Sequence, residues 1–339
     1  MERMKYENLI DSVNDSPCKD RLAAPYRREF LPPLRTGAGV FEVREGWILK
    51  ETRGGEDFFG EVAPFPGFES EQGDWMARIE RWSRGDDQSC LGVTGALGFG
   101  AWCLEQDLPF SVQASSAGMI SEEDNWMSQE KAEDRPQVVK VKIGINSPGS
   151  EQSQMDSRIQ QSGGDVRFRL DANQALNLKA TRSWMAWLDQ RPEIEFIEQP
   201  MCVGSERMLV DEFGEGARRI ALDESVVTAD HLKRILDIEW PGIFVIKPSL
   251  FGRPDDYIKL PERIRRRIVL SSAFETGVGF SFVLKIASML GDFGNVHGFG
   301  TRGRFGADGL DGWPACNFFR GEVGRKDLEN VFLRNVRGV

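Results

Sequence analysis

The chain of 339 residues is long enough for one large α/β barrel domain with an appendage, or for two ordinary domains. Its 43 basic and 53 acidic residues give a net charge of −10, which argues against nucleic acid and anionic membranes as partners. No apolar run approaches the length that spans a bilayer, and the first twenty residues lack the apolar core of a signal peptide, so we expect a cytoplasmic protein.

The first part of the chain predicts an α+β module. Residues 35–64 (RTGAGVFEVREGWILKETRGGEDFFGEVAP) have the composition of two or three antiparallel strands joined by glycine turns. The helical spacing of Trp75, Ile79 and Trp82 predicts a helix that follows these strands. We assign residues 1–107 to this capping domain.

One segment of the module has two interpretations. The stretch from Phe30 to Gly37 contains two adjacent prolines and is expected to be a loop. It is either a lid, with Leu31 and Leu34 excluding water from a site, or an ordinary surface loop.

From about residue 108 the sequence changes to short apolar strands that each precede a helical stretch. The candidate strands are FSVQA, VVKVKIG, VRFRLDA, IEFIEQ, RIALDE, IFVIKP, RIVLSS and VHGFG, and the central ones repeat every 24 to 29 residues. Eight such units favour a closed, parallel (β/α)8 (TIM-like) barrel. We therefore predict an α/β protein with a barrel at residues 108–305 and a C-terminal segment, 306–339, that returns to complete the capping domain.

The second candidate strand, VVKVKIG, carries Lys140 and Lys142 side by side on one face. Two lysines on a buried-looking strand repel each other and lose hydration, so the pair calls for a functional reason. A cation next to Lys142 lowers the pKa of its amine and makes it a usable general base. We predict that Lys140 has this effect, with Arg169 adding to it.

The next four strands end in charged residues. Asp171, Glu198 and Asp223 end the third, fourth and fifth strands, and Lys247 ends the sixth. Strand ends share one face of a parallel barrel, where catalytic groups gather. Three converging carboxylates require a cation, and oxygen ligands select a hard divalent ion, Mg²⁺ by default with Mn²⁺ as the alternative. Lys142 and Lys247 would then face each other across the metal.

This ordered set resembles the enolase superfamily, in the subgroup that has a lysine at the end of strand six. The stretches YRREFLPPLRTG, GEVAPFPGFESE, SSAFETGVG and HGFGT are most similar to the o-succinylbenzoate synthases. The resemblance covers nearly the whole chain. It implies a lyase of menaquinone or phylloquinone biosynthesis whose small-molecule carboxylate substrate is dehydrated through an enediolate.

The resemblance also implies roles for individual residues. Lys142 would be the base, and Lys247 a fixed cation against the substrate ring. Asn173 would support the metal ligands. Weaker candidates for contacts with the substrate lie on the last two strands: Ser271, Ser272, Gly298 and Gly300.

Other functions remain open at this point. The same residues would serve an N-acylamino acid racemase or a dipeptide epimerase, in which Lys247 is a second base. A glycosidase using Glu198 with Glu224 or Glu275 leaves both lysines without a role. A non-catalytic barrel would use GFGTRGRFG, after the last strand, to bind phosphate or the carboxylates to bind a metal.

Overall fold

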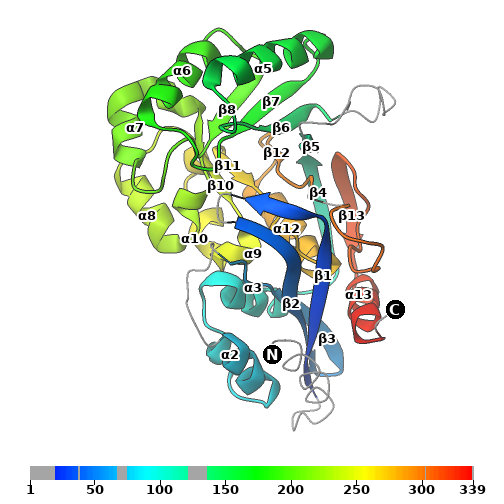
Figure 1. Cartoon of the computed structure of the whole chain (residues 1–339). Coiled ribbons are helices and arrows are strands. Elements are labelled where there is room, and N and C mark those ends of the chain that lie inside the picture. The colour runs from blue at the N-terminus through cyan, green and yellow to red at the C-terminus, as the bar shows by residue number, and fades with distance from the viewer. Residues whose placement is uncertain (1–19, 37–38, 67–74, 121–135, 302, 338–339) are drawn as a thin grey trace.

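The computed structural model describes residues 20–36, 39–66, 75–120, 136–301 and 303–337. A curved parallel sheet with helices around it lies above a smaller antiparallel sheet, and the C-terminal helix runs beside the smaller sheet (Figure 1). The predicted α/β architecture, a barrel with an N-terminal capping module, is confirmed.

The capping sheet has the antiparallel order β1-β2-β3. Its strands and the helical elements that follow are β1 (Arg21–Thr36), β2 (Gly39–Arg53), β3 (Glu56–Val62), α2 (Trp75–Ser83), η1 (Gln88–Leu91) and α3 (Gly95–Leu104). The predicted amphipathic helix is α2, which buries Ile79 and Trp82 against Trp47 and Leu49 of the sheet. This apolar layer gives the capping sheet a core of its own.

The main sheet has the order β11-β10-β9-β8-β7-β6-β5, and each described pair of neighbours is parallel. Its strands are β5 (Gly118–Ile120), β6 (Val138–Lys142), β7 (Arg167–Asp171), β8 (Ile194–Glu198), β9 (Ile220–Leu222), β10 (Ile243–Ile246) and β11 (Ile268–Leu270). The intervening helical elements are α5 (Pro148–Ser162), α6 (Leu178–Leu188), α7 (Glu206–Phe213), η3 (Gly214–Arg219), η4 (Glu224–Val226), α8 (Ala229–Asp237), α9 (Pro248–Phe251), α10 (Asp255–Ile258) and α11 (Glu262–Arg265). Among the described residues, no helix has both the length and the apolar character needed to cross a bilayer.

The first barrel strand differs from the prediction because it is split in two. β4 (Phe110–Ser116) pairs in parallel with β12 (Val296–His297), whereas β5 pairs with β6 on the other side. The break falls at Ala117, so the two halves of one strand serve two neighbours. A bridge between Ser271 and Gly298 joins β11 to β12 and completes the circuit of strands.

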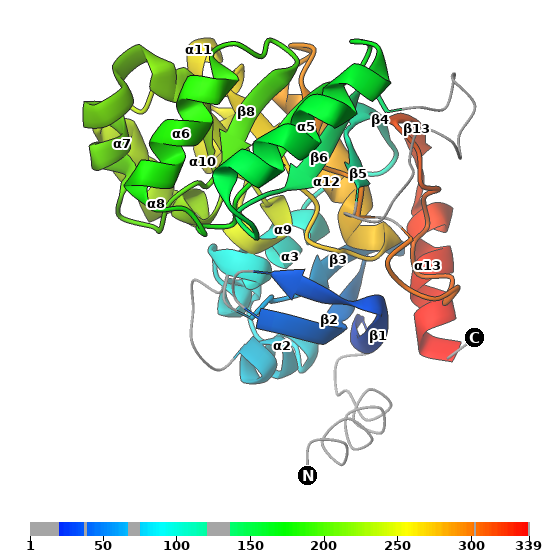
Figure 2. The ribbon, with the colours of Figure 1, turned by 45° about the horizontal axis from the view of Figure 1, so that its top comes forward.

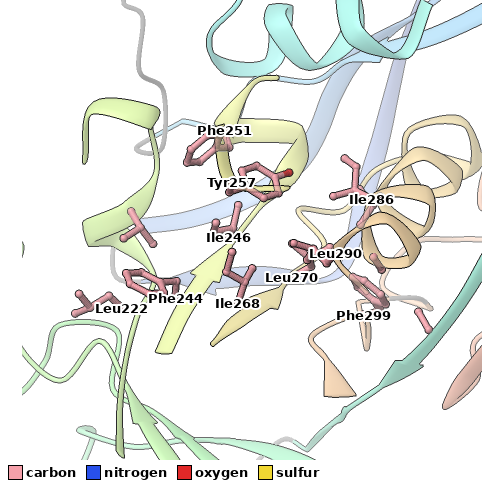
Figure 3. Close-up of a cluster of buried hydrophobic side chains, with 14 of the residues drawn as sticks. Leu222, Phe244, Ile246, Phe251, Tyr257, Ile268, Leu270, Ile286, Leu290 and Phe299 are labelled. Atoms are coloured by element: carbon pink, nitrogen blue, oxygen red, sulfur yellow. The ribbon is translucent and has the colours of Figure 1, made fainter. Parts of the chain in front are cut away.

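Alternation along the barrel strands, interrupted in β8 by a register shift between Ile194 and Phe196, separates the helix-facing side chains from the interior ones. Figure 3 shows side chains of β10 and β11 directed toward the helices, among them Ile246 and Leu270, with Ile286 and Leu290 of α12 (Gly277–Leu290) beside them. The intervening residues of neighbouring strands form a separate cluster, Phe196, Ala221 and Val245. Because side chains alternate between faces, the residues two positions further along each strand also face inward, at the rim.

The C-terminal segment contacts both parts of the protein. β13 (Phe318–Val323) adds an antiparallel strand to β4 of the barrel. α13 (Arg325–Arg337) then lies beside the capping sheet, where Asn335 Nδ2 donates to the carbonyl oxygens of Ala24 and Pro25 (Figure 2). The predicted return to the capping domain thus includes a strand on the barrel, while the boundaries at residues 107 and 305 stay predictions.

The expected loop at Phe30–Gly37 is wrong over the described residues, because β1 continues to Thr36. The register of β1 and β2 shifts between Glu29 and Leu34, which accommodates the two prolines as a bulge. Leu34 is buried but Leu31 is 57 % exposed, so only one of the two leucines is placed to exclude water. Gly37 lies outside the described residues.

His297 on β12 makes the folding stability depend on pH. It is buried, and its Nδ1 accepts a hydrogen bond from the Leu270 amide (3.1 Å). Burial, with a smaller effect of Arg169, lowers the pKa of His297 to about 3. The unfolded chain therefore binds the proton more readily between about pH 6.5 and pH 3, and stability falls as the pH falls through this window.

We expect the free energy of unfolding to decrease by about 2 kcal/mol through this residue between pH 7.5 and pH 5. Urea unfolding at the two pH values measures the decrease in the wild type and in His297→Asn, which keeps a hydrogen-bond acceptor but does not titrate. His231→Gln, at the other histidine of the chain, is the control. Equal pH dependence in the wild type and His297→Asn would contradict the prediction.

Candidate active site

The charged residues predicted from the strand ends lie along one rim of the barrel. Lys142 of β6 is paired in register with Asp171 of β7, which is paired in turn with Glu198 of β8. Asp223 directly follows β9, and Lys247 directly follows β10. Since β7, β8 and β9 lie between β6 and β10, the two lysines are on opposite sides of the barrel, as predicted.

The three carboxylates are buried and make ion pairs with lysines. Lys140 Nζ lies 2.8 Å from Asp171 Oδ2 and 2.9 Å from Glu198 Oε1. Lys247 Nζ is hydrogen-bonded to Asp223 Oδ1. The lysines therefore compensate the carboxylate charges in this arrangement.

Burial is the main cause that raises the pKa of Glu198 to about 8, against the opposing effect of Lys140. The nearby carboxylates of Asp171 and Asp223 add to the rise. Burial alone would lower the pKa of Lys140, but these carboxylates together raise it well above its ordinary value. Lys140 is thus a permanent cation in the site, and its predicted effect on Lys142 stays a prediction.

The donor set fits a hard divalent cation. Three buried carboxylates on successive strands supply only oxygen atoms, which are the ligands that hard divalent ions prefer. Within the described ranges, no three Asp, Glu, His or Cys side chains are arranged to hold an ion as they stand. Lys140 lies between two of the predicted ligands, so metal binding would require the carboxylates to exchange lysine contacts for the ion.

Lys142 differs from the other lysines of the rim. It is exposed, and its Nζ lies 3.5 Å from the carbonyl oxygen of Arg35, near the end of β1. The capping domain therefore reaches the rim at the predicted base. On the opposite side, Lys247 and Asp223 line a small cavity together with apolar side chains of Val226, Val245 and Leu250.

The predicted supporting residues have specific partners. The backbone N–H of Asn173 donates to Asp171 Oδ1 (3.1 Å), and the positive φ of Asn173 (42°) belongs to the turn that makes this contact. Arg169 Nε lies 2.6 Å from Glu195 Oε2, and its guanidinium lies over the Phe196 ring. Asn173 thus contacts a predicted metal ligand, whereas the described contacts of Arg169 are one layer deeper in the barrel.

Three of the four weaker candidates, Ser271, Ser272 and Gly298, meet where β11 and β12 join, and Gly300 follows two residues after Gly298. Ser271 Oγ donates to the Gly298 carbonyl (3.4 Å), and a side chain at Gly298 would place its Cβ 3.2 Å from that hydroxyl. Ser272 Oγ donates to Glu275 Oε2 (2.6 Å) and accepts from Thr301 Oγ1 (2.8 Å). The Ser272 hydroxyl therefore already has protein partners both as a donor and as an acceptor. Ser271 and Gly300 are half-buried and so remain accessible to a ligand.

Two further residues that position the site escaped the sequence analysis. The buried Gln199 accepts from the Asp223 amide (2.9 Å) and donates to Ser225 Oγ (2.9 Å), and so links the ends of β8 and β9. The Glu151 carboxylate accepts from the three consecutive amides of residues 144–146, directly after the strand of Lys142. The EQP triplet at the end of β8 was a sequence signal for Gln199. No sequence signal pointed to Glu151, because it lies on a helix and the pattern that identified the site covers only strand ends.

Comparison with known proteins agrees with this geometry. The family described as Enolase C-terminal domain-like matches residues 126–265. The o-succinylbenzoate synthase of Thermosynechococcus vestitus is 30 % identical over 285 residues, which cover 75 % of this chain and 84 % of that protein. The o-succinylbenzoate synthase of Yersinia enterocolitica is 27 % identical over 316 residues, covering 87 % of this chain and 94 % of that protein.

Solved structures of o-succinylbenzoate synthases and related enzymes also resemble this chain. The o-succinylbenzoate synthase of Thermosynechococcus elongatus, determined with Mg in its active site, superposes with a TM-score of 0.73 at 26 % identity. The match covers 93 % of this chain and 99 % of that chain. The L-Ala-D/L-Glu epimerase of Bacillus subtilis has the same fold, with a TM-score of 0.66 at 15 % identity and coverage of 90 % of this chain and 96 % of that chain. Fold, rim residues and relatives together show that the chain belongs to the o-succinylbenzoate synthase family of the enolase superfamily and is a lyase.

Proposed function

We propose that the enzyme dehydrates 2-succinyl-6-hydroxy-2,4-cyclohexadiene-1-carboxylate to o-succinylbenzoate, in menaquinone or phylloquinone biosynthesis, and that it depends on Mg²⁺. The observation that carries the proposal is the rim itself: three buried carboxylates lie between two lysines on opposite strands, in a chain related to o-succinylbenzoate synthases. Asp171, Glu198 and Asp223 would hold the ion. When bound, Mg²⁺ would hold the substrate carboxylate and stabilise the negative charge that develops on it.

Lys142 Nζ would take the proton from the ring carbon that bears the carboxylate. The electron pair of that C–H bond would first be delocalised onto the substrate carboxylate, and it would then form the new ring double bond as the carbon–oxygen bond of the ring hydroxyl breaks. The ammonium of Lys142 would return the proton to the departing hydroxyl, so that one water leaves and the ring becomes aromatic. One lysine on one face of the ring therefore suffices for a syn elimination.

Lys247 would act as a fixed cation against the ring. Its place directly after β10, opposite Lys142 on β6, supports this role, because a lysine there would face the side of the ring from which no proton is removed. A racemase or epimerase acting on N-acylamino acids or dipeptides would need Lys247 as a second base. The fold shared with the Bacillus subtilis epimerase keeps this activity as the second candidate.

The deciding experiment is an ultraviolet assay for aromatisation of the cyclohexadiene substrate, with Mg²⁺ and with EDTA. Turnover that requires Mg²⁺ would support the proposal. In parallel, exchange of the α-proton of N-acylamino acids and dipeptides in D₂O tests the second candidate. Exchange without aromatisation would overturn the substrate assignment in favour of that candidate.

A further inference from the structure

The segment that follows β11, residues 271–276 (the 271–276 segment), is held by the capping domain as well as by the barrel. Arg44 of β2 donates from Nε to the Ala273 carbonyl (3.1 Å). Glu61 of β3 accepts hydrogen bonds from the Thr276 amide (3.1 Å), the Thr276 hydroxyl and the Gly279 amide (2.9 Å). Two capping-domain side chains of opposite charge therefore bind one barrel segment at two points, Ala273 and Thr276.

Both side chains are almost completely buried. Arg44 is 2 % exposed and Glu61 is 1 % exposed. Arg44 also donates to the carbonyl oxygens of Ala63 and Pro64, and the Tyr26 hydroxyl donates to Glu61 (2.7 Å). Burying a charge is costly unless its partners are well placed, so these contacts are sensitive to any change at the interface.

Gly279 shows that the approach of Glu61 is close. A Cβ atom at this position would lie 2.7 Å from Glu61 Oε2, a distance that real Cβ atoms essentially never show. Gly279 lies inside helix α12, where alanine would otherwise be the better helix former. The absence of a side chain at this position is what admits the capping-domain carboxylate.

On the barrel side, the same segment contacts the residues after Lys247. The buried Glu275 accepts from the Ala273 amide (2.8 Å) and from the hydroxyls of Ser272 and Ser249. Ser249 is two residues beyond Lys247. The 271–276 segment is thus connected to the lysine side of the rim.

The segment also belongs to an apolar cluster that includes Leu250, and Leu250 lines the small cavity beside Lys247 and Asp223. Phe274, at a positive φ of 65°, packs edge-on against Phe30 of β1, with ring centroids 5.0 Å apart. The Phe305 ring stacks on Phe30 at 4.8 Å and also lies edge-on to Phe274, with ring centroids 6.3 Å apart. The position of Phe274 therefore depends on the contacts that hold the segment on either side of it.

We propose that Arg44 and Glu61 are positioning residues that hold the 271–276 segment and thereby set the affinity for the substrate. This inference rests on the proposed function. The described contacts of Arg44 and Glu61 do not include Lys142 or the three carboxylates, so their effect is on substrate binding rather than on proton transfer. Substitutions should therefore raise KM and leave kcat nearly unchanged.

The test changes the Glu61 contact from both sides, with Glu61→Gln in the capping domain and Gly279→Ala in the barrel. Each variant is expected to raise KM about tenfold, since each disturbs buried hydrogen bonds to a charged group. The affinity for Mg²⁺, measured by calorimetry, should stay within about threefold of the wild type. Glu51→Gln is the matched control, because Glu51 is an equally buried glutamate of β2 whose described ion pairs, with Arg21 and Arg53, stay inside the capping domain.

Two measurements distinguish positioning from general destabilisation. Amide hydrogen exchange at Thr276 and Gly279 should increase in both variants and not in Glu51→Gln. The dissociation constant of o-succinylbenzoate, measured by calorimetry with Mg²⁺, should rise in parallel with KM. Faster exchange with unchanged KM and product affinity would overturn the proposal, as would an equal effect of Glu51→Gln.

Failure of the positioning role can be distinguished from failure of the proposed function. If the wild type does not aromatise the cyclohexadiene but exchanges the α-proton of N-acylamino acids, the proposed function fails. The same KM comparison on those substrates then decides the positioning role. A KM unchanged by Glu61→Gln and Gly279→Ala overturns that role with either substrate.

Discussion

Replacement of Lys142 by methionine is expected to reduce turnover of the cyclohexadiene substrate by about 10³-fold or more, because the amine that would move the proton is lost. Methionine is chosen because it keeps the length of the side chain. The structure makes this variant informative. Lys142 is exposed and lies against the Arg35 carbonyl, whereas the carboxylates are bound by Lys140 and Lys247. Mg²⁺ affinity should therefore survive the substitution.

Three measurements check this prediction: the ultraviolet assay, calorimetric titration with Mg²⁺, and urea unfolding. Lys179→Met, at an exposed position of α6, is the control for loss of one surface lysine. A Lys142→Met enzyme that keeps more than about a tenth of wild-type turnover would exclude Lys142 as the base.

Replacement of Glu198 by glutamine is expected to weaken Mg²⁺ binding by about 100-fold or more and to reduce turnover correspondingly, because it removes one of three carboxylates that would hold the ion. Without metal the variant should fold. Glutamine has nearly the same shape, and Lys140 keeps its ion pair with Asp171. Calorimetry with Mg²⁺ alone measures the binding without relying on activity.

Glu195→Gln is the matched control on the same strand. Glu195 is also paired with a cation, Arg169, but this pair lies deeper in the barrel than the rim. Its replacement should leave Mg²⁺ affinity within about threefold of the wild type. Equal losses in the two variants would show that Glu198 affects the ion only through the overall charge of the barrel.

Much of the barrel could be predicted because its signals are local. The alternation in VVKVKIG determines which side chains share a face, and strand ends determine which of them reach the rim. Lys142, Asp171 and Glu198 therefore become neighbours in any parallel sheet with this strand order, as the register shows. The capping strands and α2 were predictable for the same reason.

Other features were not local and were missed or wrongly assigned. The strand containing Phe110 divides at Ala117 because it must pair with β12 on one side and β6 on the other, which no pattern within the strand specifies. The segment at Phe30 is strand rather than loop. Its partners are β2 and, through a bridge, Phe305, which is distant in the sequence.

The sequence by itself determined the barrel, the capping module and the identity of the charged rim residues, because each depends on periodicity and strand order. Only the tertiary structure decided which charges pair, since Lys140 meets Asp171 and Glu198 through side-chain reach across strands. It also decided how the capping domain docks. The contact of Glu61 with Gly279 joins positions 218 residues apart. It forms because the glycine has no side chain at the place where the capping-domain carboxylate reaches the barrel helix.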